Sequence, residues 1–377
     1  MLKQRDQAST DAPAVMDCRN GAEDADGVSR RRFLTSLVAF GASAMLPSSV
    51  SRAQTVPHGS GNRPNRIDVQ HHILPTPYMR SQRDRILSSV EPSLIPLVLE
   101  WTPERALEEM DRNGVSTGIT SLGGPGVWLG DAQASRRLAR ACNEYAAQLV
   151  RDHPGRFGMF AAVPLPDPEG SLKEIEYALD VLKADGVGLL TSYGDKWPGD
   201  PSNAPVWEEL NRRKAVVFFH PVAPACCRNL IPDVAPPVIE FVFDITRAIT
   251  SLLWSGSLSR FPDIRFIFTH AGGTMPMLAS RVEWYLSRHK GLAERLPNGV
   301  AYELKKLYYD VANSVNPSSM AALMKMVPVS QIVFGSDYPF VNMSEMAQGL
   351  DHFPLSVPNR RAINRDNATR LFPRLNG

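Results

Sequence analysis

The chain has little of what marks the more specialised classes of protein. Its 377 residues carry a net charge of only +2, which gives no reason to expect nucleic acid or an anionic membrane as a partner. Its four cysteines show neither the spacing of a zinc finger nor that of a disulfide framework. No Gly-x-Gly-x-x-Gly follows the first expected strand, which argues against dinucleotide binding. The composition therefore leaves an ordinary globular enzyme or binding protein.

The N-terminal region carries an export pattern. Residues 29–35 (SRRRFLT) are similar to the twin-arginine consensus, and a weakly apolar stretch follows at about 33–46. This stretch is shorter than the ~20 residues that a membrane-spanning helix needs. Small residues then lead to residues 51–53 (SRA), which form a plausible small-x-small cleavage site. We expect residues 1–53 to be a Tat signal peptide and residues 54–377 to be a periplasmic domain without a membrane span; the alternative is a basic arm before a short buried helix.

Short apolar runs alternate with longer helical patterns along the rest of the chain. Runs such as residues 216–219 (VVFF) and 266–268 (FIF) are continuously apolar, as strands buried on both faces are. Repeated strand–helix alternation indicates βαβ units and a parallel sheet. Eight units fit a closed (β/α)₈ TIM barrel, an α/β fold, better than an open sheet. The expected strands are residues 67–72, 117–121, 157–163, 186–191, 215–220, 265–270, 307–311 and 332–337.

Polar residues close four of these strands. Gln70 and His72 end the first strand, His220 the fifth, His270 the sixth and Asp337 the eighth. Active sites of barrels lie at the C-terminal ends of the strands. Residues two apart on a strand point to the same face, so Gln70 and His72 are expected to converge. Imidazole and carboxylate donors are suited to Zn²⁺ or Mn²⁺.

The same segments resemble one enzyme family, the branch of the amidohydrolase superfamily that contains aminocarboxymuconate-semialdehyde decarboxylase. The resemblance runs from about residue 67 to residue 372. Its motifs are residues 67–75 (IDVQHHILP), 219–221 (FHP), 269–273 (THAGG) and 334–340 (FGSDYPF). Within the branch, two further segments are most similar to 6-methylsalicylate decarboxylases, namely residues 190–195 (LTSYGD) and 210–217 (LNRRKAVV).

The resemblance implies roles for the residues at the strand ends. His72, His220 and Asp337 correspond to ligands of a divalent metal ion, for which we expect Zn²⁺, with Mn²⁺ as the alternative. His270 corresponds to the general acid or base beside the metal, and Asp337 is a second candidate for proton transfer. Gln70 departs from the pattern, because the family has His or Glu there. An amide oxygen is a weaker, neutral ligand, and His71, the nearest substitute, should point to the opposite face.

Two further residues are candidates for substrate binding. Arg281, eleven residues beyond His270, corresponds to an arginine that in some members reaches the substrate carboxylate of a neighbouring subunit, which implies a homodimer. A guanidinium is suited to that task because it pairs bidentately with a carboxylate. The alternative for Arg281 is an ordinary surface charge. Trp197, in the loop after the fourth strand, is interpreted as a wall of the substrate pocket or as an anchor of its loop.

The resemblance predicts a metal-dependent, non-oxidative decarboxylase of a small hydroxylated aromatic carboxylic acid. In this reaction the metal would hold substrate oxygens, and an acid would deliver a proton to the carbon that loses CO₂. The same ligands would serve a hydrolase or lactonase, in which metal-bound hydroxide attacks a carbonyl. A non-catalytic exported binding protein is the third hypothesis, and only Gln70 suggests it.

Overall fold

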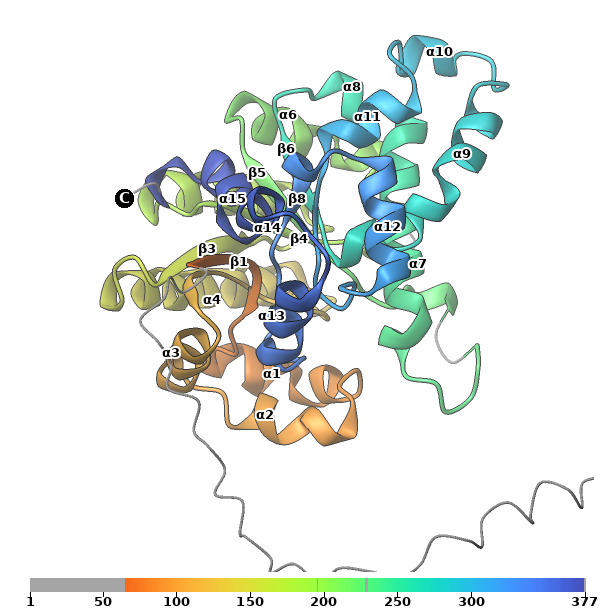
Figure 1. Ribbon diagram of the computed structural model, residues 1–377. Helices are drawn as coiled ribbons and strands as arrows, with labels where there is room; N and C mark the ends of the chain where they lie inside the picture. Colours follow the sequence, from red (N-terminus) through yellow and green to blue (C-terminus); the bar gives the residue numbers. More distant parts are fainter. Residues whose placement is uncertain (1–64, 195, 228–229, 376–377) are drawn as a thin grey trace, which may run out of the picture. The chain divides into compact units, whose positions relative to one another are not determined.

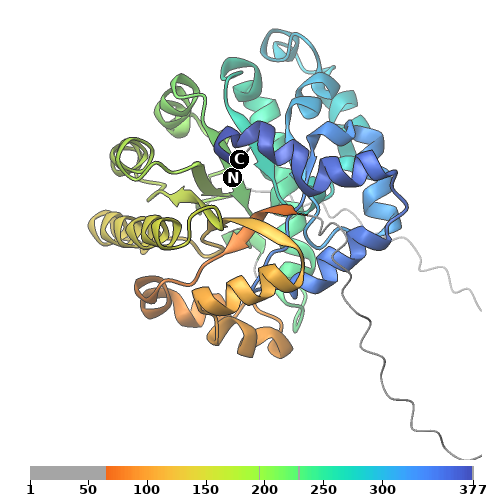
Figure 2. The same ribbon diagram turned by 60° about the vertical axis from the view of Figure 1, so that its left-hand side comes forward.

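The computed structural model describes residues 65–194, 196–227 and 230–375. The expected signal peptide, residues 1–53, lies outside the described residues. In the described part, eight parallel strands are hydrogen-bonded in sequence order, from β1 to β8. Helices cover the outside of the sheet (Figure 1), and a second view shows strands at the centre with helices around them (Figure 2). The predicted (β/α)₈ barrel is confirmed.

The strands are short, and most follow the expected bounds. They are β1 (Arg66–His72), β2 (Val115–Ser121), β3 (Phe157–Ala162), β4 (Gly186–Leu190), β5 (Val216–His220), β6 (Arg265–Phe268), β7 (Tyr308–Asp310) and β8 (Ile332–Val333).

The helices follow the strands in the order that βαβ units require. They are α1 (Thr76–Leu87), α2 (Ile95–Leu99), α3 (Pro103–Arg112), α4 (Ala132–Asp152), α5 (Pro168–Glu176), α6 (Ala204–Arg212), α7 (Pro236–Ser255), α8 (Ser257–Arg260), α9 (Met275–Leu286), α10 (Leu292–Arg295), α11 (Val300–Lys306), α12 (Pro317–Met326), α13 (Met343–His352), α14 (Val357–Arg361) and α15 (Asn367–Leu371).

Local sequence explains several of these helix boundaries. Thr102 accepts a hydrogen bond from the backbone N–H of Arg105 and so caps the start of α3. Asp131 does the same for α4 through the N–H of Ala134. Gly256, in a left-handed conformation with φ 73°, separates α7 from α8. A helix that continued through this point would need a right-handed residue there.

Backbone hydrogen bonds connect the end of the sheet to its beginning. The N–H of Val69 donates to the carbonyl oxygen of Phe334 at 3.0 Å, and the N–H of His72 donates to that of Tyr338 at 2.8 Å. The N–H of Asp337 in turn donates to the carbonyl oxygen of Gln70 at 2.8 Å. These bonds place the segment after β8 beside the end of β1. The metal-site candidates of both segments therefore meet.

Two strands end more than one residue earlier than the sequence predicts. We expected strands to continue to His270 and to Asp337, but β6 ends at Phe268 and β8 ends at Val333. The backbone excludes both predicted end residues from a strand, because His270 has φ 50° and Asp337 has φ 63°. Both values lie in the left-handed region, which no strand residue adopts. Both residues therefore belong to loops at the C-terminal mouth of the barrel.

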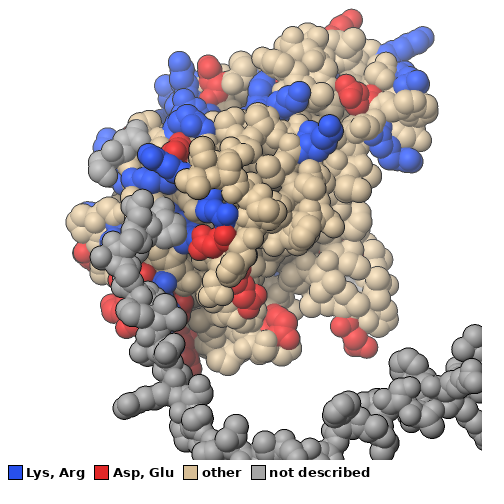
Figure 3. Space-filling model, viewed as in Figure 1, with Lys and Arg blue, Asp and Glu red and all other residues tan. Residues whose placement is uncertain are grey.

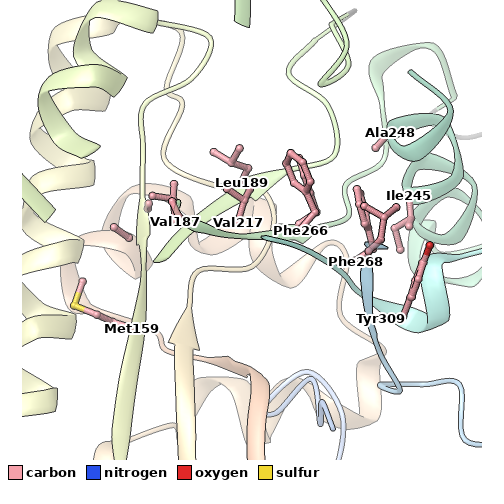
Figure 4. Packing of buried hydrophobic residues seen from close by; sticks show 14 of the residues in the cluster. Met159, Val187, Leu189, Val217, Ile245, Ala248, Phe266, Phe268 and Tyr309 are labelled. Carbon is pink, nitrogen blue, oxygen red and sulfur yellow. The ribbon is translucent and has the colours of Figure 1, made fainter. Parts of the chain in front are cut away.

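The apolar core has two layers. Inside the barrel, apolar strand residues pack with residues of the C-terminal helix α15; these strand residues include Ile67, Ile119, Phe160, Phe218 and Ile267. Outside it, the other face of each strand packs against the helices, as Figure 4 shows for strand residues that lie opposite Ile245 and Ala248 of α7. Both faces of the sheet are thus buried, which explains the continuously apolar strands.

Charged side chains are unevenly spread over the surface. On the face shown in Figure 3, lysine, arginine and acidic residues are scattered around a broad uncharged area.

Within the described residues, no helix combines the length and apolarity that crossing a bilayer requires.

Candidate metal centre and active site

Three predicted ligands meet at the mouth of the barrel. One donor atom from each of His72, His220 and Asp337 can be chosen so that all three lie within 4.8 Å of one another, and all three side chains are buried. Nε2 of His72 lies 3.0 Å from Asp337 Oδ1, and Nε2 of His220 lies 3.9 Å from the same oxygen. Residues far apart in sequence thus present one carboxylate and two imidazoles to a common point.

Neighbouring groups orient both imidazoles. Two groups approach Nδ1 of His220, the carbonyl oxygen of Pro221 at 2.8 Å and the backbone N–H of Gly124 at 3.2 Å; the shorter contact, to an atom that can only accept, favours a proton on Nδ1 and a lone pair on Nε2. Nδ1 of His72 lies 3.1 Å from Ser121 Oγ. A hydrogen bond on the far nitrogen is the usual support of a metal-binding histidine. Ser121 ends β2 and was not singled out from the sequence.

Two side chains of β1, two residues apart, face the site, and the strand is irregular where they lie. The pairing of β1 with β2 shifts between Asp68 and His71, as in a β-bulge. His72 and Gln70 face Asp337, whereas His71 packs in the wall against Phe157 and Tyr338 with no exposed surface. His71 thus points away from the site, as the sequence predicted.

Gln70 is fully buried, and its side chain makes one good hydrogen bond. Its Nε2 donates to Asp337 Oδ1 at 2.8 Å, and the same nitrogen lies 3.5 Å from Nε2 of His270. Its Oε1 has no hydrogen-bond partner among the described residues. A buried hydrogen-bond acceptor without a partner costs free energy. The amide oxygen of Gln70 is therefore available as a ligand atom at the edge of the metal site.

His270 lies beside the ligands in a short turn, η5 (His270–Gly272). Its Nδ1 lies 3.1 Å from the carbonyl oxygen of Ala312, so Nδ1 carries the proton and Nε2 faces Gln70. His270 and Ala271 both have left-handed φ values, 50° and 57°. Such conformations in non-glycine residues concentrate at functional sites, where the surrounding structure holds them.

Electrostatics favour the protonation states that a metal ion requires. Burial, followed by the proximity of His72, lowers the pKa of His220 to about 3. Burial also lowers the pKa of His270. Burial opposes ionisation of Asp337, but the hydrogen bond from His72 and the nearby imidazoles outweigh it, so the pKa of Asp337 is below its usual value. Neutral imidazoles beside a carboxylate are the forms that ligate metals.

The donor set fits a divalent transition metal. Zinc binds histidine nitrogen and carboxylate oxygen at about 2.0–2.2 Å in a tetrahedron, so neighbouring donors lie about 3.4 Å apart. The two imidazole Nε2 atoms lie 3.0 and 3.9 Å from Asp337 Oδ1, on either side of that spacing, and all three donors lie within 4.8 Å of one another. The unpartnered Oε1 of Gln70 offers a fourth donor when the amide is turned, because Oε1 and Nε2 then exchange places. Two imidazoles with two oxygens suit Zn²⁺ and Mn²⁺ alike.

Asn313 supports the site although the sequence did not indicate it. Its Nδ2 donates to Asp337 Oδ2 at 3.0 Å, which leaves Asp337 Oδ1 for the centre of the site. Asn313 lies just beyond β7 and has φ 52°. Its position after a strand was the one available signal, since polar residues at strand ends belong to the active-site face.

A cavity of about 430 Å³ adjoins His220. Gly124 and Phe241 line it, and both approach His220, Gly124 through a backbone nitrogen 3.2 Å from Nδ1 and Phe241 with its ring 6.2 Å away between centroids. The volume is in the range of small-molecule sites, about 300–1,000 Å³. Arg85 of α1 is the one charged residue among the described lining residues. Arg85 was not predicted from the sequence, because α1, the helix that carries it, contains no recognisable motif.

The two predicted substrate residues lie outside this cavity lining. Trp197 is half-buried, and its indole Nε1 donates to Asp244 Oδ1 of α7 at 2.7 Å, so it holds the loop after β4 against that helix. Arg281 is exposed on α9, with its guanidinium 5.3 Å from the ring centre of Tyr285. An exposed position is what contact with a neighbouring subunit requires. Within the described chain, neither residue is brought to the metal centre.

Fold and site together define a class: a parallel barrel whose mouth holds two histidines and an aspartate at metal-ligand spacing, with a further histidine beside them, is typical of metal-dependent barrel enzymes. The chain belongs to the amidohydrolase family, which it matches over residues 67–374. The resemblance inferred from the sequence is thereby confirmed.

Individual relatives narrow the class. Decarboxylase yanB from Aspergillus niger is 37% identical over 328 residues, which cover 82% of this chain and 88% of that protein. A 6-methylsalicylic acid decarboxylase from Penicillium expansum is 34% identical over 319 residues, 83% of this chain and 97% of that protein. Among solved structures, a dihydroxybenzoic acid decarboxylase from Polaromonas sp. JS666 superimposes with a TM-score of 0.70 at 22% identity, covering 82% and 97% of the two chains. The expected enzyme class, a carboxy-lyase of the amidohydrolase superfamily, is confirmed.

Proposed function

We propose that the protein is a metal-dependent, non-oxidative decarboxylase of a benzoic acid that carries a hydroxyl group ortho to its carboxylate. The observation that carries the proposal is the convergence of His72, His220 and Asp337 beside the free Nε2 of His270. The curated relatives support the substrate class, since one of them is named for 6-methylsalicylic acid.

We further propose that the site holds one Zn²⁺ or Mn²⁺ ion through His72, His220 and Asp337, with Gln70 as a weak fourth ligand. When bound, the ion would hold the carboxylate and the adjacent hydroxyl oxygen of the substrate and withdraw electrons from them. A dihydroxybenzoic acid decarboxylase of similar fold contains manganese, which keeps that ion beside zinc as a candidate.

His270 is the proton donor in this proposal. Decarboxylation breaks the bond between the ring carbon and the carboxylate carbon, releases CO₂ and leaves an electron pair on the ring carbon, which must take up one proton. Because Nδ1 of His270 is held by the carbonyl of Ala312, Nε2 is the nitrogen that must take up one proton from solvent and pass it to the ring carbon as CO₂ leaves. Asp337 is the alternative donor, but its carboxylate already contacts Gln70, His72 and Asn313.

The proposal includes assembly and location. Met277, Trp284 and Tyr285 of α9 are each more than half exposed, on the helix that carries Arg281. A large exposed apolar surface is typical of an interface, so we propose a homodimer in which Arg281 approaches the partner's site.

The arginine-rich motif at residues 29–35 supports export to the periplasm by the twin-arginine route.

The test is a decarboxylation assay on protein stripped with a chelator and reloaded separately with Zn²⁺ or Mn²⁺. Salicylate, 6-methylsalicylate and 2,6-dihydroxybenzoate are the substrates, and benzoate, which lacks the ortho hydroxyl, is the matched control. We expect release of CO₂ and the corresponding phenol from at least one hydroxy acid and none from benzoate. His270→Ala should retain metal but lose activity. Inactivity towards all three acids, together with hydrolysis of a lactone or ester, would establish the hydrolase alternative.

A further inference from the structure

A buried carboxylate lies behind the acid–base histidine. Asp310 ends β7 and has no exposed surface. Its Oδ1 accepts two backbone hydrogen bonds, from the N–H of His270 at 2.9 Å and from the N–H of Ala312 at 3.1 Å. One oxygen atom therefore connects the loop after β6 to the loop after β7.

The two hydrogen bonds fix both the backbone of His270 and, through Ala312, its imidazole ring. The first binds the backbone of His270, whose φ of 50° is unfavourable for a residue with a side chain. The second binds the backbone of Ala312, whose carbonyl oxygen lies 3.1 Å from His270 Nδ1. Asp310 thus determines where the main chain of His270 lies and where the acceptor of its imidazole lies, which together aim Nε2 at the site.

The surroundings indicate that only one carboxylate oxygen matters. Asp310 Oδ2 has no hydrogen-bond partner among the described residues. A Cβ atom at Gly335 would lie only 2.9 Å from Cγ of Asp310, closer than real Cβ contacts allow. Gly335 therefore provides the space that the Asp310 side chain occupies. A general structural anchor would be expected to use both oxygens, whereas here a single acceptor serves the two N–H groups of the catalytic loops.

We propose that Asp310 is a positioning residue that aims Nε2 of His270 at the substrate through a single oxygen acceptor. The inference rests on the proposed function, in which His270 transfers the proton. It predicts that the acceptor oxygen is needed and that the second oxygen is not. Asparagine keeps one such oxygen and has nearly the shape of aspartate, whereas alanine keeps none.

The test compares Asp310→Asn with Asp310→Ala in the metal-loaded full-length protein. We expect kcat of Asp310→Ala to fall by about 100-fold, the order expected when a catalytic group moves by about 1 Å, with metal content and KM close to those of the parent. Asp310→Asn should recover most of kcat. The matched control is Glu303→Ala, which removes another buried acid, one that contacts Ser259 and Lys306 in the helical shell; its kcat should equal that of the parent.

Two outcomes would overturn the inference: parent-like kcat in Asp310→Ala, or an equal loss in Asp310→Asn and Asp310→Ala. If Asp310→Ala does not fold, Gly335→Ala replaces it, because the added methyl displaces the carboxylate without removing it. We expect a large loss of kcat with metal retained, and an unchanged kcat would contradict the proposal.

A readout independent of turnover separates this inference from the proposed function. In ¹⁵N-histidine-labelled protein, the Nδ1–H signal of His270, assigned by its disappearance in His270→Ala, should be lost in Asp310→Ala and kept in Asp310→Asn. If the parent decarboxylates none of the acids, the proposed function fails, and the behaviour of this signal still supports or refutes the role of Asp310.

Discussion

The sharpest prediction concerns Gln70, where the chain departs from its family. In the described structure Oε1 of Gln70 is buried without a partner, while Nε2 donates to Asp337 Oδ1. An unpaired buried acceptor costs about 1–3 kcal/mol. A metal ion that contacts Oε1 removes this cost. Turning the amide towards the ion gives up the hydrogen bond from Nε2 to Asp337 Oδ1, so binding gains at most about 1–3 kcal/mol from Gln70, which corresponds to at most about 5- to 150-fold in affinity.

The perturbation consists of two variants at Gln70, with one variant at His220 for comparison. Gln70→Ala should weaken metal binding by a factor in that range, and His220→Ala should weaken it more, because an imidazole is a stronger ligand than an amide oxygen. Gln70→His should strengthen Zn²⁺ binding by restoring a usual ligand. Activity of Gln70→His need not rise, since a stronger ligand leaves the ion less electrophilic and occupies a position that the substrate could use.

The assay is chelator competition at one pH for the parent, the three variants and His289→Ala, which alters an exposed histidine and should bind metal as the parent does. If Gln70→Ala and Gln70→His both bind metal with the parent's affinity, the reasoning fails. Gln70 would then serve only as a hydrogen-bond donor to Asp337, and the centre would consist of His72, His220 and Asp337.

Three further predictions concern export, pH and assembly. Replacing Arg30 and Arg31 by lysine should leave the precursor in the cytoplasm; undiminished periplasmic delivery would refute the targeting hypothesis. Burial lowers the pKa of His220 to about 3, whereas an unfolded histidine titrates near ~6.5, so the metal-free protein should lose stability as pH falls from about 6.5 towards 3. His220→Gln should reduce that loss in urea unfolding at pH 7, 5 and 4, and an identical pH dependence would contradict the prediction. Mixing Arg281→Ala with His270→Ala protein should restore activity if Arg281 acts across a dimer interface; an inactive mixture would place it elsewhere.

Much of the fold and the core of the site could be predicted from the sequence. Apolar runs and helical periodicity are local signals, and they indicated eight strands whose order the structure confirms. Because a closed parallel barrel brings its strand ends to one face, the positions of His72, His220 and Asp337 in the sequence were enough to predict their convergence. The alternation of side chains along β1 also placed His71 on the opposite face.

The remaining features depend on contacts between segments that are distant in sequence. The left-handed turns at His270 and Asp337 end β6 and β8 early, and hydrogen bonds from other strands hold them, so no local pattern predicts them. Asp310 carried only the general signal of a polar residue near a strand end, because its role exists only once β7 lies beside the loop after β6. The sequence by itself determined which donors and which barrel are present. Only the tertiary structure decided which atom of each donor faces the centre, since that choice depends on partners supplied by neighbouring strands.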